Sequence, residues 1–599
     1  MKSFVRSAIV LFFVSAAFAQ SDRGTITGTI SDPAGAVIAS AAIQARNTAT
    51  DALYEAASSG TGNYTIPQLP AGTYDLTVTV PGFKKYVRQG LKVEVAENAR
   101  VDIAMEVGAN TESVTVEAAA PLLKTEGGEV SSNVSTDTLD DLPILTLTGA
   151  AAGIGTANAL GNIRNPLSSV ELLPGARITT DTIMRINGMP SSSQSINIEG
   201  QDATNGFFKQ QNQINQSGVE AIQEVAIQTS NFAAEYGQAG GGYFNYTMKS
   251  GSNQIHGSGY DYFVNEFLNA GSPFTNAGTA NPDKDGQHVR NPIRQNDYGV
   301  TFGGPVVIPK LYNGHDKTFF FFSFEQFRQS AFTSNTYSIV PTAAQRVGDF
   351  SAALSSTCNG PDPAGQPVCR NEIFDPNTNR TVNGSVVRSP FPNNMIPASR
   401  IDPTSAIVQN MIPMPNSPGL FNYTAPGYSN FRHTTIPSVK MDELISEKLK
   451  LSGYYSATKT LSPQTNGFPE PYTALQPQNA LSQTIRLNLD ATLTPTLLLH
   501  IGAGYLHTSN PQTAPLYNQK ELFPDGVPFT SSQFFPYMAG MYSTLGGGWS
   551  GGGGFPGVTN TGAAYTLTPE ANDYKPTFNA NVTWVHGNHT YKLGATALF

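Results

Sequence analysis

The chain has 599 residues, with 13% charged residues, 10% aromatic residues, 57 Gly, 41 Pro and a formal net charge of −9. This length exceeds that of one compact domain, so several modules are expected, and the many turn formers favour a mainly β architecture over a coiled coil or a charge-rich disordered chain. The acidic balance and the lack of a basic cluster argue against nucleic acid as a partner.

The N-terminus has the pattern of an export signal. Lys2 and Arg6 precede the apolar run Ala8 to Ala17, and small residues at positions 17 and 19 suit signal-peptidase cleavage. A membrane anchor is the alternative, but the run is too short to span a bilayer. We therefore predict a signal peptide over residues 1–19. No later stretch is apolar enough to form a spanning helix, so any later contact with a membrane has to use strands.

Residues 22–107 read as a small β-sandwich. Two strand patterns flank the turn Asp32 to Gly35, and two more flank Pro70 to Gly72. The segments GTITGTISDPAGAVIASA, GNYTIPQLPAGTYDLTV and PGFKKY resemble the carboxypeptidase-regulatory-like domain, a prealbumin-like sandwich. None of the eight His lies in an HxxE or HExxH arrangement, so we expect no peptidase activity. Ligand binding and a passive spacer role both remain open for this domain.

Residues 108–120 are predicted to be a linker. Within it, Val114 and Val116 alternate with polar residues, and such a segment can add as an edge strand to another protein. By position and residues the segment is similar to the TonB box of outer-membrane transporters. Its alternatives are the last strand of the sandwich or a plain linker. The candidate box comprises Glu112, Ser113, Val114, Thr115, Val116, Glu117 and Ala118.

Residues 121–250 are predicted to form a mixed α/β module. DTLDDLPIL indicates a short helix with Asp137 as N-cap and Pro143 closing it. ELLPGA, then INIEGQDAT, then GVEAIQEVAIQTSNFAAEYGQAGGGYFNYTMKSGSNQIHGS resemble the plug of TonB-dependent receptors of the Oar-like type. The chain departs from that pattern at Glu199, where the family usually has Asp before Gly.

Residues 254–599 are predicted to be part of an antiparallel transmembrane β-barrel. Long and short connections alternate, as they do between the outer and periplasmic sides of such barrels. Ile485, Leu487 and Leu489 alternate with Arg486, Asn488 and Asp490, so one face suits lipid and the other a wet lumen. NDYGVTFGGPV, DKTFFFFSFEQFR and WVHGNHTYKLGA resemble the Oar-like barrel. Aromatic residues near strand ends suggest a girdle, with simple packing as the alternative: Tyr260, Tyr262, Tyr454, Tyr455, Tyr505, Trp584 and Tyr591.

The boundary between plug and barrel falls in the stretch Gly240 to Asn265. If the barrel starts in the periplasm, the strand after Gln254 is the first to run outward, so Tyr243–Lys249 belongs to the plug and Ser250–Asn253 forms the joint. About nine strands follow, whereas plugged transporters have 22. We therefore expect the chain to be an N-terminal fragment. The alternative reads Phe599 as a true barrel terminus.

The two cysteines, Cys358 and Cys369, lie in CNGPDPAGQPVC, where Pro and Gly favour a closed loop. In an exported protein this predicts a local disulfide. A metal site would need further ligands, and a catalytic thiol would leave the second cysteine unexplained.

The resemblance implies a TonB-dependent transporter or receptor in the cell outer membrane that imports a large or scarce nutrient. Its partners would be TonB with its inner-membrane energising complex, outer-membrane lipid and an extracellular substrate: oligosaccharide, peptide and metal chelate remain open. The sandwich and plug would lie on the periplasmic side and the long loops outside. A surface adhesion or matrix protein is the alternative function. We expect no enzyme, no catalytic residue, no metal and no cofactor, since no GxSxG, zinc or paired-carboxylate pattern stands out.

Overall fold

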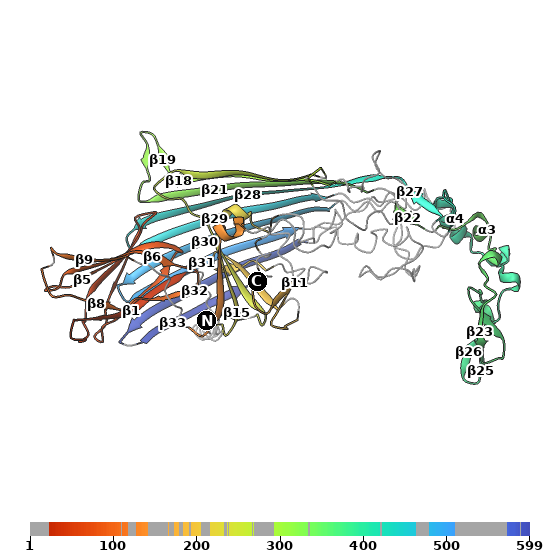
Figure 1. The fold of residues 1–599 in the computed structure, drawn as a ribbon, viewed down its shortest axis with the longest axis horizontal. Coiled ribbons are helices and arrows are strands. Elements are labelled where there is room, and N and C mark those ends of the chain that lie inside the picture. The colour runs from red at the N-terminus through yellow and green to blue at the C-terminus, as the bar shows by residue number, and fades with distance from the viewer. Residues whose placement is uncertain are drawn as a thin grey trace, which may run out of the picture.

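The computed structural model shows a small sandwich, a plug and a broad curved sheet, which we call the wall (Figure 1). It describes residues 23–109, 111–117, 127–141, 164, 166, 170, 173–178, 184–190, 193–204, 216–232, 236–237, 239–265, 267–268, 293–333, 336–338, 340–419, 422–462, 478–509, 572–587 and 589–599. The predicted signal peptide, Pro143 and Ala118 lie outside these residues.

The sandwich packs two sheets face to face. One has the order β4-β1-β7 with β8 also on β1, and the other has the order β3-β2-β5-β6-β9. Alternate residues point inward, as the period of two dictates, and Ile26, Tyr64, Tyr74 and Leu76 are fully buried between the sheets. The strands are β1 (Gly24–Ser31), β2 (Ala42–Asn47), β3 (Leu53–Ala57), β4 (Asn63–Leu69), β5 (Gly72–Thr79), β6 (Lys85–Val93), β7 (Asn98–Arg100), β8 (Ile103–Ala104) and β9 (Ser113–Glu117).

Strand β9 differs from the expected linker. It pairs in parallel with β6, from Lys85 opposite Ser113 to Gln89 opposite Glu117, and it is the last strand of its sheet. The backbone N–H of Lys85 donates to the carbonyl of Glu112 (2.9 Å), and Lys84 forms an ion pair with the Glu112 carboxylate (3.6 Å). The alternative of a final sandwich strand is therefore the conformation that the structure adopts.

The plug, residues 127–250, has a five-stranded sheet with the order β10-β15-β16-β13-β14. Its core gathers Ile196, Val225, Ile227 and Phe244, all buried. The helix begins at Thr136, so the prediction of Asp137 as N-cap is wrong: the Ser135 hydroxyl accepts from the Thr138 N–H instead (3.4 Å). The elements are β10 (Val130–Ser135), α2 (Thr136–Asp141), β11 (Ala176–Ile178), β12 (Met184–Ile186), β13 (Gln194–Ile198), β14 (Gln201–Asp202), η2 (Val219–Ala221), β15 (Ile222–Ser230) and β16 (Gly242–Met248).

The wall is a nine-stranded antiparallel sheet in which each strand pairs with the next along the chain. Among the described residues, β17 and β33 each have one neighbour, so the sheet does not close, and the prediction of an incomplete antiparallel sheet of about nine strands is confirmed. No helix in the described ranges is long and apolar enough to cross a membrane. The strands are β17 (His256–Asn265), β18 (Ile293–Pro305), β21 (Thr318–Thr333), β28 (Tyr428–Ser446), β29 (Leu449–Ser462), β30 (Gln478–Thr494), β31 (Leu497–Ser509), β32 (Asn572–His586) and β33 (His589–Leu598).

The two faces of the wall follow the predicted alternation. Ile485 and Leu487 are 40% and 52% exposed, whereas Arg486 and Asn488 are 0% and 2% exposed against the plug. Only some of the aromatic residues predicted to form a girdle face outward, because Tyr454 packs into the plug core. Tyr260 and Tyr262 likewise lie under the guanidinium of plug residue Arg164 (5.4 and 4.2 Å to the ring centres). The outward-facing members are Tyr455, Tyr505, Trp584 and Tyr591.

Short connections join the wall strands on the side of the sandwich. Strand β28 runs through Ser446, and Glu447–Lys448 makes the turn to β29. A short hairpin, β19 (Val307–Ile308) with β20 (Tyr312–Asn313), lies between β18 and β21 on the same side. The joint residue Asn253 donates to Asp316 in that connection (2.6 Å), so the joint lies at this rim.

The long connection between β21 and β28 forms an arm, residues 336–425, which projects from the opposite end of the wall (Figure 1). Cys358 and Cys369 are joined there by a disulfide that links β23 to β24. Its elements are β22 (Thr336–Ser338), α3 (Ala343–Arg346), η3 (Ser351–Ala353), β23 (Cys358–Pro361), β24 (Pro367–Cys369), η4 (Pro376–Thr378), β25 (Arg380–Val382), β26 (Ser385–Val387), η5 (Pro392–Asn394), η6 (Ala398–Arg400), α4 (Pro403–Met411) and β27 (Tyr423–Ala425).

Candidate functional site

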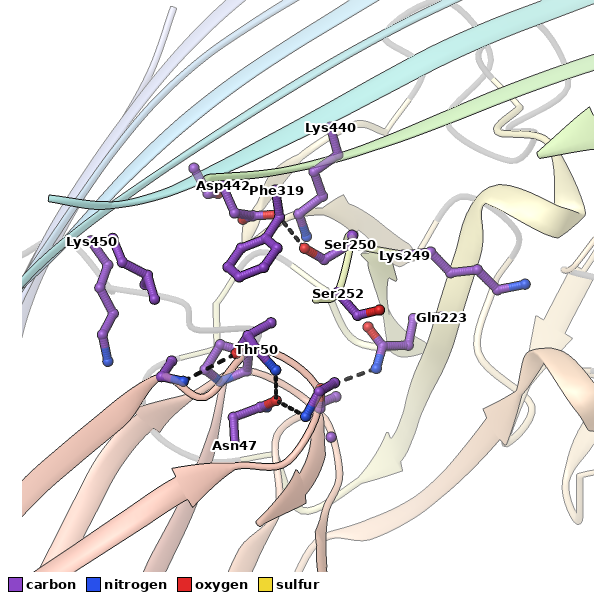
Figure 2. Close-up of a pocket in the computed structure, with 18 of the residues that line it drawn as sticks. Asn47, Thr50, Gln223, Lys249, Ser250, Ser252, Phe319, Lys440, Asp442 and Lys450 are labelled. Atoms are coloured by element: carbon purple, nitrogen blue, oxygen red, sulfur yellow. Dashed lines mark hydrogen bonds between the residues drawn. The ribbon is translucent and has the colours of Figure 1, made fainter. Parts of the chain in front are cut away.

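Sandwich, plug and wall meet around a cavity of about 440 Å³ (Figure 2). Thr50 lines it from the sandwich, Gln223 from the plug, and Phe319 and Lys450 from the wall. The Lys450 ammonium donates to the carbonyl of Leu53 (3.1 Å). Each part therefore contributes to one junction at the sandwich end of the wall.

The sandwich contacts the plug through the ends of β5 and β6. The side chain of Gln223 donates to the carbonyl of Ala71, just before β5 (3.0 Å), and the N–H of Val95, just after β6, donates to the Glu224 carboxylate (3.1 Å). Asn133 donates to the same carboxylate and to the Val95 carbonyl. Burial raises the pKa of Glu224 from 4.5 to about 7, although the bonds from Val95 and Asn133 lower it.

A tight turn of the plug makes the closest contact with the wall. We call Ile198–Asp202 the plug turn: Glu199 and Gly200 join β13 to β14 with φ angles of 51° and 75°. A two-residue hairpin of this kind needs positive φ at both positions, which Gly accepts and which strains a side chain such as Glu. Contacts of the Glu199 side chain must therefore offset this backbone strain.

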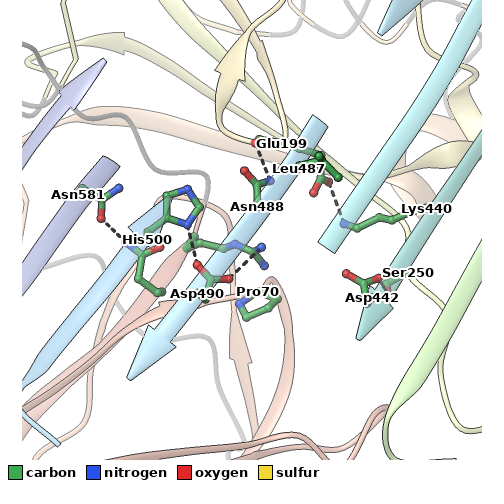
Figure 3. Close-up of polar contacts among 12 residues, drawn as sticks. Pro70, Glu199, Ser250, Lys440, Asp442, Leu487, Asn488, Asp490, His500 and Asn581 are labelled. Carbon is green, nitrogen blue, oxygen red and sulfur yellow. Dashed lines mark hydrogen bonds and ion pairs between the residues drawn. The ribbon is translucent and has the colours of Figure 1, made fainter. Parts of the chain in front are cut away.

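The Glu199 carboxylate supplies the compensation. It is 1% exposed, and it accepts from the Met248 N–H (2.7 Å) and from the Lys440 ammonium of the wall (2.9 Å). Lys440 also donates to the Met248 carbonyl (3.0 Å). Figure 3 shows Lys440 and Glu199 together with Ser250, which donates to Asp442. One buried carboxylate thus joins the plug turn, the end of β16 beside the joint and the wall strand β28. This is the role of the residue that departs from the family pattern.

Donors from the wall reach the backbone of the plug turn. These donors lie on β30 and β32 and face inward, where they meet the carbonyl oxygens of the tight turn. The bonds run from Arg486 to the carbonyls of Ile198 (3.2 Å) and Asp202 (2.8 Å), from Asn488 to Glu199 (3.2 Å), and from Asn579 to Gly200 (3.3 Å).

Two glycines of β31 make room for this contact. A Cβ on Gly504 would lie 1.8 Å from the Gln201 amide oxygen, and one on Gly502 would lie 1.9 Å from the Asn579 amide oxygen. Gln201 uses the space to donate to Asn488 (3.0 Å) and to accept from Thr577 (2.9 Å). The wall is therefore shaped to fit the plug turn.

A second polar contact lies at β21. Glu325, fully buried, accepts from the N–H of Val219 at the start of η2 (3.1 Å) and from the Tyr260 hydroxyl (2.9 Å). The plug residue Arg164 forms an ion pair with Glu220 (3.3 Å), and its N–H donates to Asp297 of the wall (3.3 Å). By contrast, of the wall residues that the structure describes, only Tyr454 packs into the apolar core of the plug. Within the described parts of the chain, polar contacts therefore dominate the attachment of plug to wall.

The residues predicted as a site lie elsewhere. Glu112–Glu117 sit in or beside β9 of the sandwich, and the disulfide sits in the arm. Sequence reasoning placed Arg486 and Asn488 on the wet face but missed their contact with the plug turn, as it missed Lys440, Thr577 and Asn579. The described residues contain no group of three or more His, Cys, Asp or Glu that could hold a metal ion.

Comparisons with known proteins agree with this architecture. The family model described as the outer membrane beta barrel domain matches residues 247–598, more than half of the chain, and the carboxypeptidase regulatory-like domain matches residues 25–106. The TonB-dependent transporter Oar of Myxococcus xanthus is 30% identical over 317 residues, which cover 50% of this chain and 27% of that relative. The match thus spans about a quarter of the relative's length.

Solved structures with a similar course of the chain include outer-membrane proteins. The transporter YddB from Escherichia coli has 12% identity and a TM-score of 0.42, covering 78% of this chain and 48% of its own. The siderophore receptor PirA from Pseudomonas aeruginosa has 10% identity and a TM-score of 0.31, covering 78% and 57%. The chain has a carboxypeptidase regulatory-like domain and is a homologue of the TonB-dependent transporter Oar. Because the family model matches more than half of its residues, the chain belongs to the outer-membrane β-barrel family and resides in the cell outer membrane.

Proposed function

We propose that the protein is a TonB-dependent importer of a large or scarce nutrient. The observation that carries the proposal is the attachment of plug to wall through hydrogen bonds and ion pairs at the plug turn. Polar contacts of this kind exchange with water when the surfaces separate, so an applied force can open them without exposing a large apolar surface. An apolar seal would resist such separation and would favour a static scaffold.

Energy would enter through the segment Glu112–Ala118. In this proposal TonB pairs with the segment and pulls on it, which loads the plug and weakens its contacts with the wall. Substrate would bind beforehand on the side of the arm. Oligosaccharide, peptide and metal chelate remain the candidate substrates, and growth of the expressing strain on single nutrient sources would select among them.

Replacing residues 112–118 by a Gly/Ser heptapeptide tests the proposal. We expect energised uptake of the selected nutrient to be abolished while binding of that nutrient to whole cells stays unchanged, because residues 112–117 lie in the sandwich and far from the arm. A matched control replaces the exposed sandwich turn 33–36, between β1 and β2, by Gly/Ser. Uptake that survives the first replacement would sink the assignment.

One observation favours a second function, a surface adhesion or matrix protein. The arm carries its own hairpins, a disulfide and the ion pair of Arg400 with Asp375 (2.6 Å), so it presents an ordered surface beyond the wall. Cell-surface binding that needs the arm but neither TonB nor residues 112–118 would support this function in place of transport.

A further inference from the structure

The strand β9 has one occupied edge and one open edge. Its inner edge forms a parallel ladder of five residue pairs with β6, and no further strand flanks it among the residues that the structure describes. Glu112, Ser113, Thr115 and Val116 are exposed, and Val114 is half-buried. An extended peptide can therefore add to the outer edge without any change in the sandwich, through the free backbone groups that an edge strand presents.

From this we infer that a TonB strand binds the outer edge of β9 while β9 stays in the sandwich, so that the sandwich itself transmits the load. The inference rests on the proposed function and adds a role for the carboxypeptidase regulatory-like domain, which becomes the coupling element. Release of β9 as a free peptide would first require breaking the β6 ladder and the ion pair of Lys84 with Glu112.

The contacts of the sandwich supply a continuous route from this edge to the plug turn. The sheet that ends in β9 is the one whose β5 and β6 abut the plug at Ala71 and Val95. These residues bond to Gln223 and Glu224 at the start of β15, and Ala71 and Val95 also pack with Ala226 in a small apolar cluster. Strand β15 pairs with β16, and β16 pairs with β13, which leads into the plug turn.

The opposite sheet of the sandwich contacts the wall at β32 and β33. Gln68 donates to Asn581 on β32 (3.2 Å), and Thr65 lies beside Thr590 on β33 (3.4 Å). The sheet with the docking edge thus carries the plug contacts, and it touches the wall where Lys450 donates to Leu53 of β3, while the other sheet rests against β32 and β33. A pull on the first sheet reaches the plug through Ala71 and Val95 and acts on it relative to β32 and β33, which is the motion that uptake requires.

A disulfide staple distinguishes docking in place from release. Val87 and Thr115 are paired across β6 and β9, and neighbouring strands lie about 5 Å apart, within the Cα separation that disulfides accept. We measure two quantities in Val87→Cys/Thr115→Cys: uptake, and binding of the soluble periplasmic domain of TonB to the purified full chain. We expect both to stay within twofold of their values in the single Thr115→Cys variant. The wild type, treated with the same reductant, controls for reduction of the arm disulfide.

A tenfold loss of TonB binding in the oxidised double variant, recovered on reduction, would overturn the inference and show that β9 must leave the sheet. Absence of TonB binding to either form would overturn it as well. Because binding is measured directly, this result is separate from the failure of the proposed function, which is uptake that survives replacement of residues 112–118.

The route through the sandwich has its own test. Gln223→Ala/Asn133→Ala removes two side chains that bond to the sandwich backbone. We expect uptake to fall at least tenfold while TonB binding and substrate binding stay within twofold, because the docking edge and the arm are untouched. Gln44→Ala, which removes an exposed bond within the sandwich to Glu55 (2.8 Å), is the matched control. Unchanged uptake in the double variant would refute the route.

Discussion

Replacing Glu224 by Gln changes the docking of the sandwich on the plug with little change in shape. The carboxylate is 6% exposed and accepts from Val95 and Asn133. The amide oxygen of Gln can accept the same bonds and carries no charge. The charged groups that act on this site are Glu94, which raises the pKa of Glu224, and Lys92, which lowers it.

The size of the effect follows from the pKa. Burial raises it from 4.5 to about 7, and this gap corresponds to about 3 kcal/mol in favour of docking with the protonated acid when undocking returns the carboxyl fully to water. Since the docked pKa is the higher one, the contribution is fully present below pH 4.5 and is lost as the pH rises to about 7. At pH 8 the docked wild type buries a charge, whereas Glu224→Gln does not.

Amide hydrogen exchange of residues 94–97 and 222–226, corrected for the intrinsic pH dependence of exchange, measures docking in the full chain. We expect protection in the wild type to fall between pH 5 and pH 8, and protection in Glu224→Gln to stay level and exceed the wild type at pH 8. Glu55→Gln, on the exposed face of the sandwich, should keep the wild-type profile. A Glu224→Gln protein with the wild-type pH profile would refute the reasoning.

Three further variants test the contacts described above. Lys440→Met leaves Glu199 buried without its cation and should weaken retention of the plug by about 3–5 kcal/mol. Urea-dependent proteolysis of the plug measures this loss of stability. The control Lys448→Met, at an exposed position, should have no effect. Gly504→Ala places a methyl group against Gln201 and should cost about 1–3 kcal/mol in the same assay, whereas Gly259→Ala, with open space at its Cβ, should not; equal effects would contradict the fit of β31 to the plug turn. Cys358→Ser/Cys369→Ser opens a loop closed across 11 positions and should destabilise the arm by about 3 kcal/mol, seen as faster proteolysis of the arm with the plug unchanged; equal rates in the two proteins would rule out a stabilising role for the bridge.

The wall could be predicted from sequence because its signal is local and repeated. Alternation such as Ile485, Arg486, Leu487 and Asn488 assigns each residue to lipid or lumen, and strand pairing between chain neighbours needs only short turns. The same reasoning identified the sandwich, where the Asp32 carboxylate accepts from the N–H groups of Ala34 and Ala36 in the expected turn.

Contacts between distant segments lay beyond such reasoning. Arg486 meets the carbonyl of Ile198 across 288 positions, and nothing local to either residue specifies that pairing. Segments with weak signals were also ambiguous. The alternation of Val114 and Val116 suits a linker, an edge strand or a partner-binding peptide equally well. Only the ladder with β6 decides the conformation of this segment. Tyr454 looked like a girdle residue because its position in the chain carries no information about the plug core that covers it.

The wall recognises the plug turn through its main chain. Arg486, Asn488 and Asn579 donate to backbone carbonyls, which every amino acid carries. The fit therefore depends on the path of the turn as well as on the contacts of Glu199 and Gln201. A substitution that shifts this short stretch of backbone would move several acceptors at once away from donors that two wall strands hold in place.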